Sequence, residues 1–268
     1  MCVMYSSMSI MIGVTLTVLG LFYIQYTAVD TITVRIPRRN DKMDTANILN
    51  EAFADAGKRY GYDSVTAEFN EFKEFKIKWR RSCGWAEFEV SDYVKNAPRN
   101  VMDGLAETIF SRITRQTRNG YPEEMMKWLT TDDFVREKQP IYLRRARNLT
   151  RTPVGEHADL RESYGRLMEL GLVIPDKDLI LTWTTQPTAK HVGHSSVLMK
   201  VVSISSVLDT PSMPSFVLDR ALHHELLHMN KGFDPFGEKH GTDFRVSERL
   251  YPHYREAEEW MKRLRLYL

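Results

Sequence analysis

The residues whose types and spacing could carry chemistry lie close together near the end of the chain, in HHELLHMNKGFDPFGEKHG (223–241). Within it, His224, Glu225 and His228 spell H-E-x-x-H. On a helix, positions i and i+4 lie on one face, so the two imidazoles can bind one metal ion. Glu225, next to the first ligand, can reach a metal-bound water and act as general base. The stretch therefore predicts metal-assisted hydrolysis.

A zinc ion that keeps one open position needs a third protein ligand. His240, twelve residues beyond His228, is the favoured candidate, because two glycines and a proline between them must end the helix and let a loop return. The alternative treats His240 as an exposed turn residue and takes Glu248, on the following helix, as the ligand. His223 is interpreted as a neighbour on another face of the helix. The predicted zinc (Zn²⁺) ligands are therefore His224, His228 and His240.

The elements that must position these residues form an α+β pattern. Helical spacing of apolar residues predicts helices over 43–59, 100–117, 123–137, 158–170, 214–230, 242–249 and 252–268. Alternating or β-rich runs predict strands over 65–69, 75–79, 85–90, 179–185 and 197–205. The loop-like stretch 152–157 is the best candidate for a domain boundary.

The two halves of the chain resemble each other. Residues 90–113 and 204–229 can be aligned so that VMD (101–103) lies against VLD (217–219), and each half runs helix, strands, proline-bearing loop, long helix. We predict a duplication of one unit; the alternative is two generic α+β segments with a coincidental match. Where the second half has the H-E-x-x-H residues, the first has Thr108, Ile109 and Arg112. The N-terminal copy is therefore predicted to be degenerate, without metal ligands.

HHELLH followed by HGTDF resembles the SprT-like family of zinc metallopeptidases, whose pattern is HExxH, a variable loop, and a third histidine opening HGxxF. Residues 183–211 are similar to the family's sheet, whose last strand precedes the metal helix, and the likeness covers residues 158–268. It implies a zincin-like fold, related to M48-like enzymes. It also implies zinc ligands at His224, His228 and His240 and a catalytic acid/base at Glu225. The chain lacks the cysteine-rich ribbon of some relatives.

The favoured function is that of a zinc-dependent endopeptidase acting on a protein or peptide substrate, which could add to the sheet edge beside the metal helix. Three residues are candidates for an additional electrophile: Tyr251, His253 and Tyr254. His191 and His194 are interpreted as loop or edge residues, and an edge position would bring them near a substrate.

Two other functions remain open at this stage. One is a non-catalytic, zinc-stabilised protein-binding module, although such a module has no need of Glu225. The other is a DNA-associated protease acting on chromatin or crosslinked proteins. Basic runs at 36–41, 78–82 and 142–151 could contact phosphates, although such runs are more often solvated faces.

Composition limits these alternatives. Among 268 residues, 37 Lys and Arg face 35 Asp and Glu, a net charge of +2 that does not indicate a nucleic-acid binder. Cys2 and Cys83 are too few for a disulfide framework or a thiolate zinc cluster, and they fit a reducing compartment.

The N-terminus has no charged side chain before residue 30, and residues 8–29 are long enough to span a membrane as a helix. Basic residues follow this segment and none precedes it, which predicts a cytoplasmic protein anchored to the inner face of the cell membrane. The alternative is that the true start lies at Met43. The predicted organisation is an apolar segment (1–42), an N-terminal α+β domain without metal ligands (43–151) and a SprT-like metallopeptidase domain (152–268).

Overall fold

The computed structural model describes residues 7–11, 27–31, 41–116, 120–234 and 236–268, with side chains described from Thr45 onward. The chain divides into two compact units, Met1–Asp44 and Thr45–Leu268. In the first unit, β1 (Ser7–Met11) pairs antiparallel with β2 (Thr27–Thr31). The predicted membrane span 8–29 thus has strands at its described ends, and its middle lies outside the described residues. Across the ranges described, no helix is both long and apolar enough to cross a membrane.

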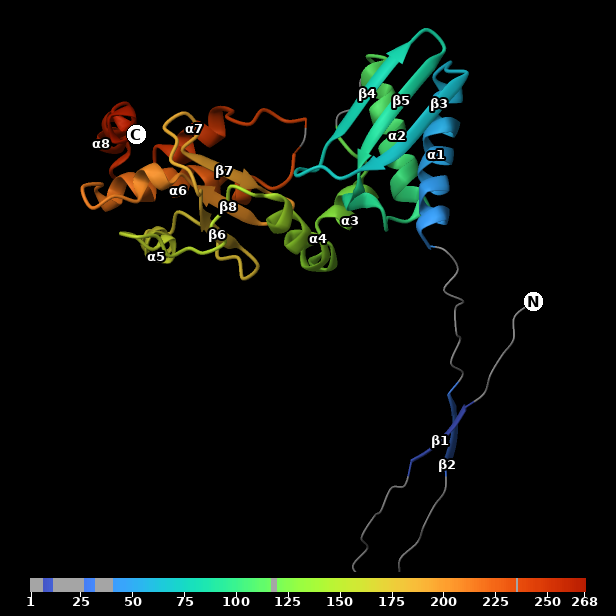
Figure 1. Cartoon of the computed structure of the whole chain (residues 1–268), viewed down its shortest axis with the longest axis horizontal. Helices are drawn as coiled ribbons and strands as arrows, with labels where there is room; N and C mark the ends of the chain where they lie inside the picture. Colours follow the sequence, from blue (N-terminus) through green and yellow to red (C-terminus); the bar gives the residue numbers. More distant parts are fainter. Residues whose placement is uncertain (1–6, 12–26, 32–40, 117–119, 235) are drawn as a thin grey trace, which may run out of the picture. The chain divides into compact units, whose positions relative to one another are not determined.

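The first segment of the second unit consists of α1 (Asp41–Arg59, in this unit from Thr45 onward), β3 (Ser64–Asn70), β4 (Ile77–Ser82), β5 (Trp85–Ser91) and α2 (Arg99–Ile113). The sheet has the order β3-β5-β4, with β3 parallel and β4 antiparallel to β5. Both helices lie on the same face of this sheet (Figure 1). Phe88 on the sheet packs 4.8 Å from the Phe53 ring of α1 and 5.1 Å from the Phe110 ring of α2, which anchors the core.

Two helices connect this segment to the next, α3 (Glu123–Leu129) and α4 (Asp132–Arg145). The sequence predicts a single helix over 123–137, but the helix is interrupted at Thr131. The hydroxyl of Thr131 accepts a hydrogen bond from the amide of Phe134, which makes it the N-cap of a new helix.

The second segment contains α5 (Leu160–Glu169), β6 (Ile180–Trp183), β7 (Gly193–Ser196), β8 (Val201–Ile204) and α6 (Ser215–Lys231). Its sheet has the order β6-β8-β7, with β6 parallel and β7 antiparallel to β8. The helices α7 (Thr242–Glu248) and α8 (Tyr254–Met261) and a final 3₁₀ turn (Leu264–Tyr267) follow. The chain is therefore α+β, as predicted.

The two segments share one topology and one register. In the first sheet, Val90 of the central strand pairs with Phe69 and Ile77. The corresponding triplet in the second sheet is Ile204, Trp183 and Gly193. A buried serine lies at the end of β5 (Ser91) and directly after β8 (Ser205), and in each segment a 3₁₀ turn and a long helix with a proline N-cap follow. This agreement is what the predicted repeat requires.

The predicted strand over 197–205 is wrong in its first half. The chain forms β7 first and then turns at Val197–Lys200, where Lys200 has φ +49, before β8 begins. Leu198 and Met199 in this turn are buried in the hydrophobic core. An apolar turn without glycine or proline has the same sequence pattern as a buried strand. The turn was therefore predicted as the start of the next strand, and β7, which precedes the turn, was not predicted.

Contacts between the two segments make residues 45–268 a single unit. Gln139 of α4 donates hydrogen bonds to the carbonyls of Asp178 and Met199. The predicted boundary at 152 lies in a connection bonded to the second sheet, because the Trp183 indole donates to the Pro153 carbonyl. Ser196 of β7 also donates a hydrogen bond to Glu74 of the first segment. Hydrogen bonds therefore join the second sheet both to the connection and to the first segment.

Candidate metal centre

Helix α6 carries the H-E-x-x-H residues. It begins after Pro214 and ends at Gly232, whose φ of +79 lies in the left-handed region that favours glycine. One side of α6 is buried in the core, and the rings of His224 and His228 lie one turn apart with centroids 5.1 Å apart. The two histidines are therefore presented on one face, as the i, i+4 spacing predicts.

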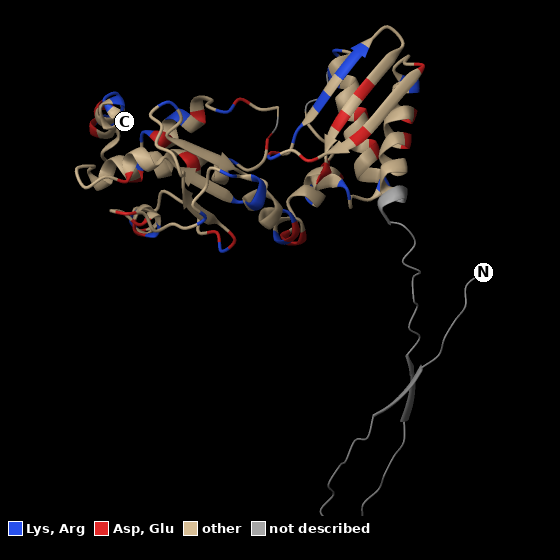
Figure 2. Ribbon diagram, viewed as in Figure 1, with Lys and Arg blue, Asp and Glu red and all other residues tan. Residues whose placement is uncertain are grey.

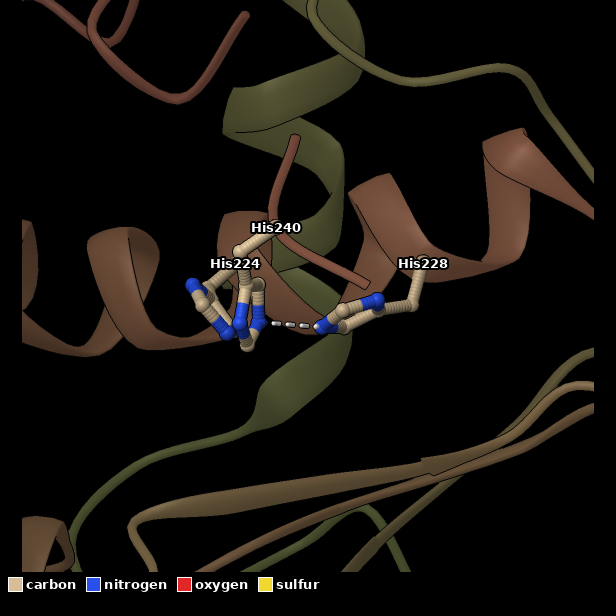
Figure 3. A group of neighbouring side chains, drawn as sticks. All are labelled: His224, His228 and His240. Carbon is tan, nitrogen blue, oxygen red and sulfur yellow. Dashed lines mark hydrogen bonds between the residues drawn. The ribbon is translucent and has the colours of Figure 1, made fainter. Parts of the chain in front are cut away.

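The loop after α6 brings His240 back to this face. Figure 3 shows the His240 ring beside His224 and directed at His228. The Nε2 atoms of His240 and His228 are 3.1 Å apart, and one donor atom from each of the three rings lies within 4.8 Å of the others. Two imidazole nitrogens on one tetrahedral zinc ion would be about 3.3 Å apart. The three histidines thus lie close enough to bind a metal ion.

Glu248, the alternative third ligand, lies behind His224. Its Oε1 is 2.5 Å from Nδ1 of His224 and 2.7 Å from Nη2 of the buried Arg220. Burial raises the pKa of Glu248, but the hydrogen bonds and charges of His224 and Arg220 outweigh it and hold the pKa at about 2. A carboxylate on Nδ1 orients the ring and leaves Nε2 free to coordinate. Glu248 therefore occupies the supporting position, and His240 completes the group.

The other two histidines of the group are held neutral. Burial, followed by the proximity of His224, lowers the pKa of His228 to about 4 and lowers the pKa of His240 as well. Neutral imidazole is the form that coordinates a metal, so the lowered pKa values of His228 and His240 favour metal binding.

Glu225 is buried beside the group, with 7% of its surface exposed. Burial raises its pKa above the ordinary value, against the lowering influence of His224 and a hydrogen bond from Ser195. The carboxyl also lies against Gly193 on β7, where a Cβ would come within 2.5 Å of its Oε1. A carboxylate with a raised pKa beside a metal is suited to accept a proton near neutral pH.

The three histidines line a cavity of about 760 Å³. Residues of the first segment also line it, among them Glu74, Ile109 and Arg112. His194 on β7 also lines the cavity. Its Nε2 is 3.1 Å from Oε1 of Glu74, and the hydroxyl of Ser196 donates a hydrogen bond to Oε2 of the same carboxylate. The edge position expected for His194 is confirmed. Nothing in the sequence indicated Glu74, because it lies 120 residues away from its partner.

The predicted electrophile candidates do not line this cavity in the part of the chain that the structure describes. Tyr251 is buried and its hydroxyl donates to the carbonyl of Phe216. His253 pairs with Glu256 on the surface, and the Tyr254 ring is covered by the guanidinium of Arg220. Closeness in sequence to the metal helix did not bring these side chains to the site.

The loop that carries His240 is packed on the first segment through an aromatic cluster of four rings. The Tyr121 ring stacks on Phe233 at 6.4 Å and meets Phe236 at 5.0 Å, and Phe75 packs 6.0 Å from Phe233. Arg112 of α2 lies over the Phe236 ring, 4.1 Å from its centroid. The first segment therefore helps to fix the position of the third histidine.

His223 lies on another face of α6 than His224 and His228, as predicted. It is fully buried, and neither ring nitrogen has a hydrogen-bond partner among the described residues. Burial lowers its pKa to about 4, so protonation opposes folding.

Protonation of His223 should cost no stability above pH 6.5, its ordinary pKa, because the ring is then neutral in both the folded and the unfolded chain. The cost should grow as the pH falls from 6.5 toward 4, where the unfolded chain binds a proton that the folded chain does not. We expect His223→Phe to remove about 3 kcal/mol of this acid destabilisation from the metal-free protein. Urea unfolding of both proteins between pH 7 and 4 measures the difference. Parallel pH dependence in the two proteins would contradict the expectation.

Comparison with known proteins returned no match, whether to family models, to curated proteins or to solved structures. The function must therefore be argued from the site itself.

Proposed function

We propose that the chain is a zinc-dependent endopeptidase of zincin-like, SprT-like fold. The observation that carries this proposal is the convergence of His224, His228 and His240 beside the buried carboxyl of Glu225. Three imidazoles favour zinc among the common divalent ions of catalytic sites. Zinc bound there would lower the pKa of a coordinated water toward 7 and polarise the scissile carbonyl.

The roles of the chain's own residues follow from their positions. Glu225 accepts the proton from the attacking water and passes it to the leaving amine. Glu248 holds Nδ1 of His224 and thereby orients the ring. The Glu74–His194 pair, at the cavity wall, places a polar ring where a substrate carbonyl can meet it.

A polypeptide suits this cavity because β7 lies along it. β7 pairs with β8 on one side only, and its other edge has no strand partner within the described ranges. An extended chain can add to such an edge through main-chain hydrogen bonds, which do not depend on side-chain identity.

The two alternative functions are disfavoured. A purely structural zinc site does not require a buried carboxyl group beside it, whereas here Glu225 is such a group and burial raises its pKa. Two of the three cations of the basic strand β4 are paired with its neighbour β5, Lys78 with Glu89 and Arg80 with Glu87 (Figure 2). Paired cations provide little attraction for phosphates.

The test is metal-dependent cleavage of an unfolded, fluorescently labelled protein. We expect the purified chain to cleave it, a chelator to abolish cleavage, and stoichiometric zinc to restore it. The double variant His224→Ala/His228→Ala, purified in the same way, controls for a contaminating protease. Chelator-resistant cleavage, or equal cleavage by the double variant, would contradict the proposal.

Gly193 should be required for the alignment of the general base. In Gly193→Ala the new methyl group would collide with Glu225, and the flexible carboxyl would move. A displacement of about 1 Å can reduce turnover about 10²-fold, whereas the three histidines are untouched. We expect a loss of kcat of that order with unchanged zinc content, measured by peptide hydrolysis and metal analysis. Gly165→Ala, at a position where a Cβ meets no atom within 4 Å, is the matched control.

A further inference from the structure

The cavity is lined by corresponding faces of the two segments. Many of its lining residues fall into pairs with one constant separation, 116 residues, as between 75 and 191. The pairs are Phe75 and His191, Ile77 and Gly193, Trp79 and Ser195, Ile109 and Glu225, and Arg112 and His228. Since the segments also share topology and register, equivalent surfaces of the two units meet across the cavity.

The substitutions within these pairs show how the two faces differ. The second segment leaves room for a carboxyl group by combining Gly193 with Glu225, whereas the first has Ile77 and Ile109 at the same places. Among these five pairs, the one charged residue of the first segment is Arg112, which stands where the second segment has His228. The first face therefore presents a cation at the position that corresponds to a histidine of the metal group.

Arg112 is exposed and carries no ion pair with any carboxylate in the described part of the chain. Its guanidinium carbon lies over the Phe236 ring, 4.1 Å from the ring centroid. This contact holds the cation at the cavity without pairing its N–H groups with a carboxylate. A guanidinium presented in this way can bind a carboxylate with two parallel hydrogen bonds.

The remaining charges of the cavity reinforce this preference. Its three carboxylates are already engaged: Glu74 binds His194 and Ser196, Asp234 accepts from backbone amides of its own loop, and the buried Glu225 has a hydrogen bond from Ser195. Three lysines of the lining have no carboxylate partner in the described ranges: Lys76, Lys231 and Lys239. The cavity therefore offers unpaired positive charge beside the metal site.

We propose that Arg112 is the specificity-determining residue of this cavity and binds a carboxylate of the polypeptide substrate. The carboxylate comes from an acidic side chain near the scissile bond or from the substrate's C-terminus. The degenerate copy is then the substrate-holding face, opposite the face that holds the metal. This inference rests on the proposed peptidase function.

The test uses quenched fluorescent peptides that differ only by Glu against Gln near the scissile bond, each with a free or an amidated C-terminus. We expect the wild type to prefer the acidic member of a pair about tenfold or more in kcat/KM. Arg112→Gln should lower that ratio toward one, whereas the exposed Arg144→Gln should keep it. The ratio is unaffected by the fraction of metal-loaded enzyme, and the preferred pair shows which carboxylate is bound.

Binding gives a readout that does not depend on turnover. Zinc-loaded Glu225→Gln should bind the labelled acidic peptide about tenfold more tightly than the neutral one, and Arg112→Gln added to it should remove the difference. Absence of cleavage by the wild type refutes the peptidase proposal, and the binding arm still decides the role of Arg112. Equal binding of the two peptides, or displacement of the acidic peptide by duplex DNA at physiological salt, overturns the assignment of Arg112.

Discussion

Replacement of Glu225 by glutamine should reduce peptide hydrolysis about 10²- to 10⁴-fold and leave the bound zinc in place. Glutamine has nearly the same size, so the packing against Gly193 is retained, but it cannot accept a proton. The amide removes the general base without touching the three imidazoles. The measurement is kcat/KM on a quenched peptide, together with the zinc content of the same samples.

A matched control for this variant is Glu162→Gln on the exposed face of α5, which should behave as the wild type. If Glu225→Gln kept full activity, Glu225 would have no part in catalysis and another group would have to accept the proton. If the variant instead lost its zinc, the carboxyl would be supporting the metal site rather than the reaction.

Replacement of His240 by alanine should abolish stoichiometric zinc binding, and with it hydrolysis. Only two ligands from α6 would remain, and the loop could not supply a third imidazole. Glu248→Gln should be milder, because loss of a group that orients a ligand typically weakens metal affinity about 10- to 100-fold. Competition with a chromophoric zinc chelator measures both affinities under the same conditions.

The two variants separate the alternatives for the third ligand. Wild-type affinity in His240→Ala, with complete loss of zinc in Glu248→Gln, would make Glu248 the ligand and would overturn the site described here. Circular dichroism of each variant in the presence of chelator controls for misfolding, since the metal-free wild type is then the proper reference.

The metal group was predictable from sequence because its geometry is mostly local. The i, i+4 spacing fixes His224 and His228 on one face of α6, and the glycines after it predict a return of the loop that carries His240. The sequence could not decide between His240 and Glu248 as the third ligand. Both residues follow the helix closely enough in sequence for the chain to return to the two histidines, so the structure was required. The similarity of the two segments was also predictable, since the VxD match lies at the same place in both long helices.

The other half of the cavity could not be predicted in this way. Glu74 and Arg112 reach it through packing between segments more than 100 residues apart in sequence. The position of Gly193 beside Glu225 was not predicted, because its strand β7 was not predicted. The apolar turn after β7 has the sequence pattern of a strand and was taken as part of the next one. Tyr251, His253 and Tyr254 were chosen for their closeness in sequence. Tyr251 donates a hydrogen bond to the Phe216 carbonyl, His253 contacts Glu256 on the surface, and the Tyr254 ring contacts the guanidinium of Arg220 instead.

An aromatic cluster joins the loop that carries His240 to the first segment, because Phe233 and Phe236 of the loop pack against Tyr121 and Phe75. Any force or partner that separated these rings would also pull His240 away from His224 and His228. If the three histidines bind a metal ion, thermodynamic reciprocity requires that the ion strengthen the contact between the two segments by the same free energy. Metal binding and the association of the segments would then share one coupling energy, which unfolding with and without the ion can measure.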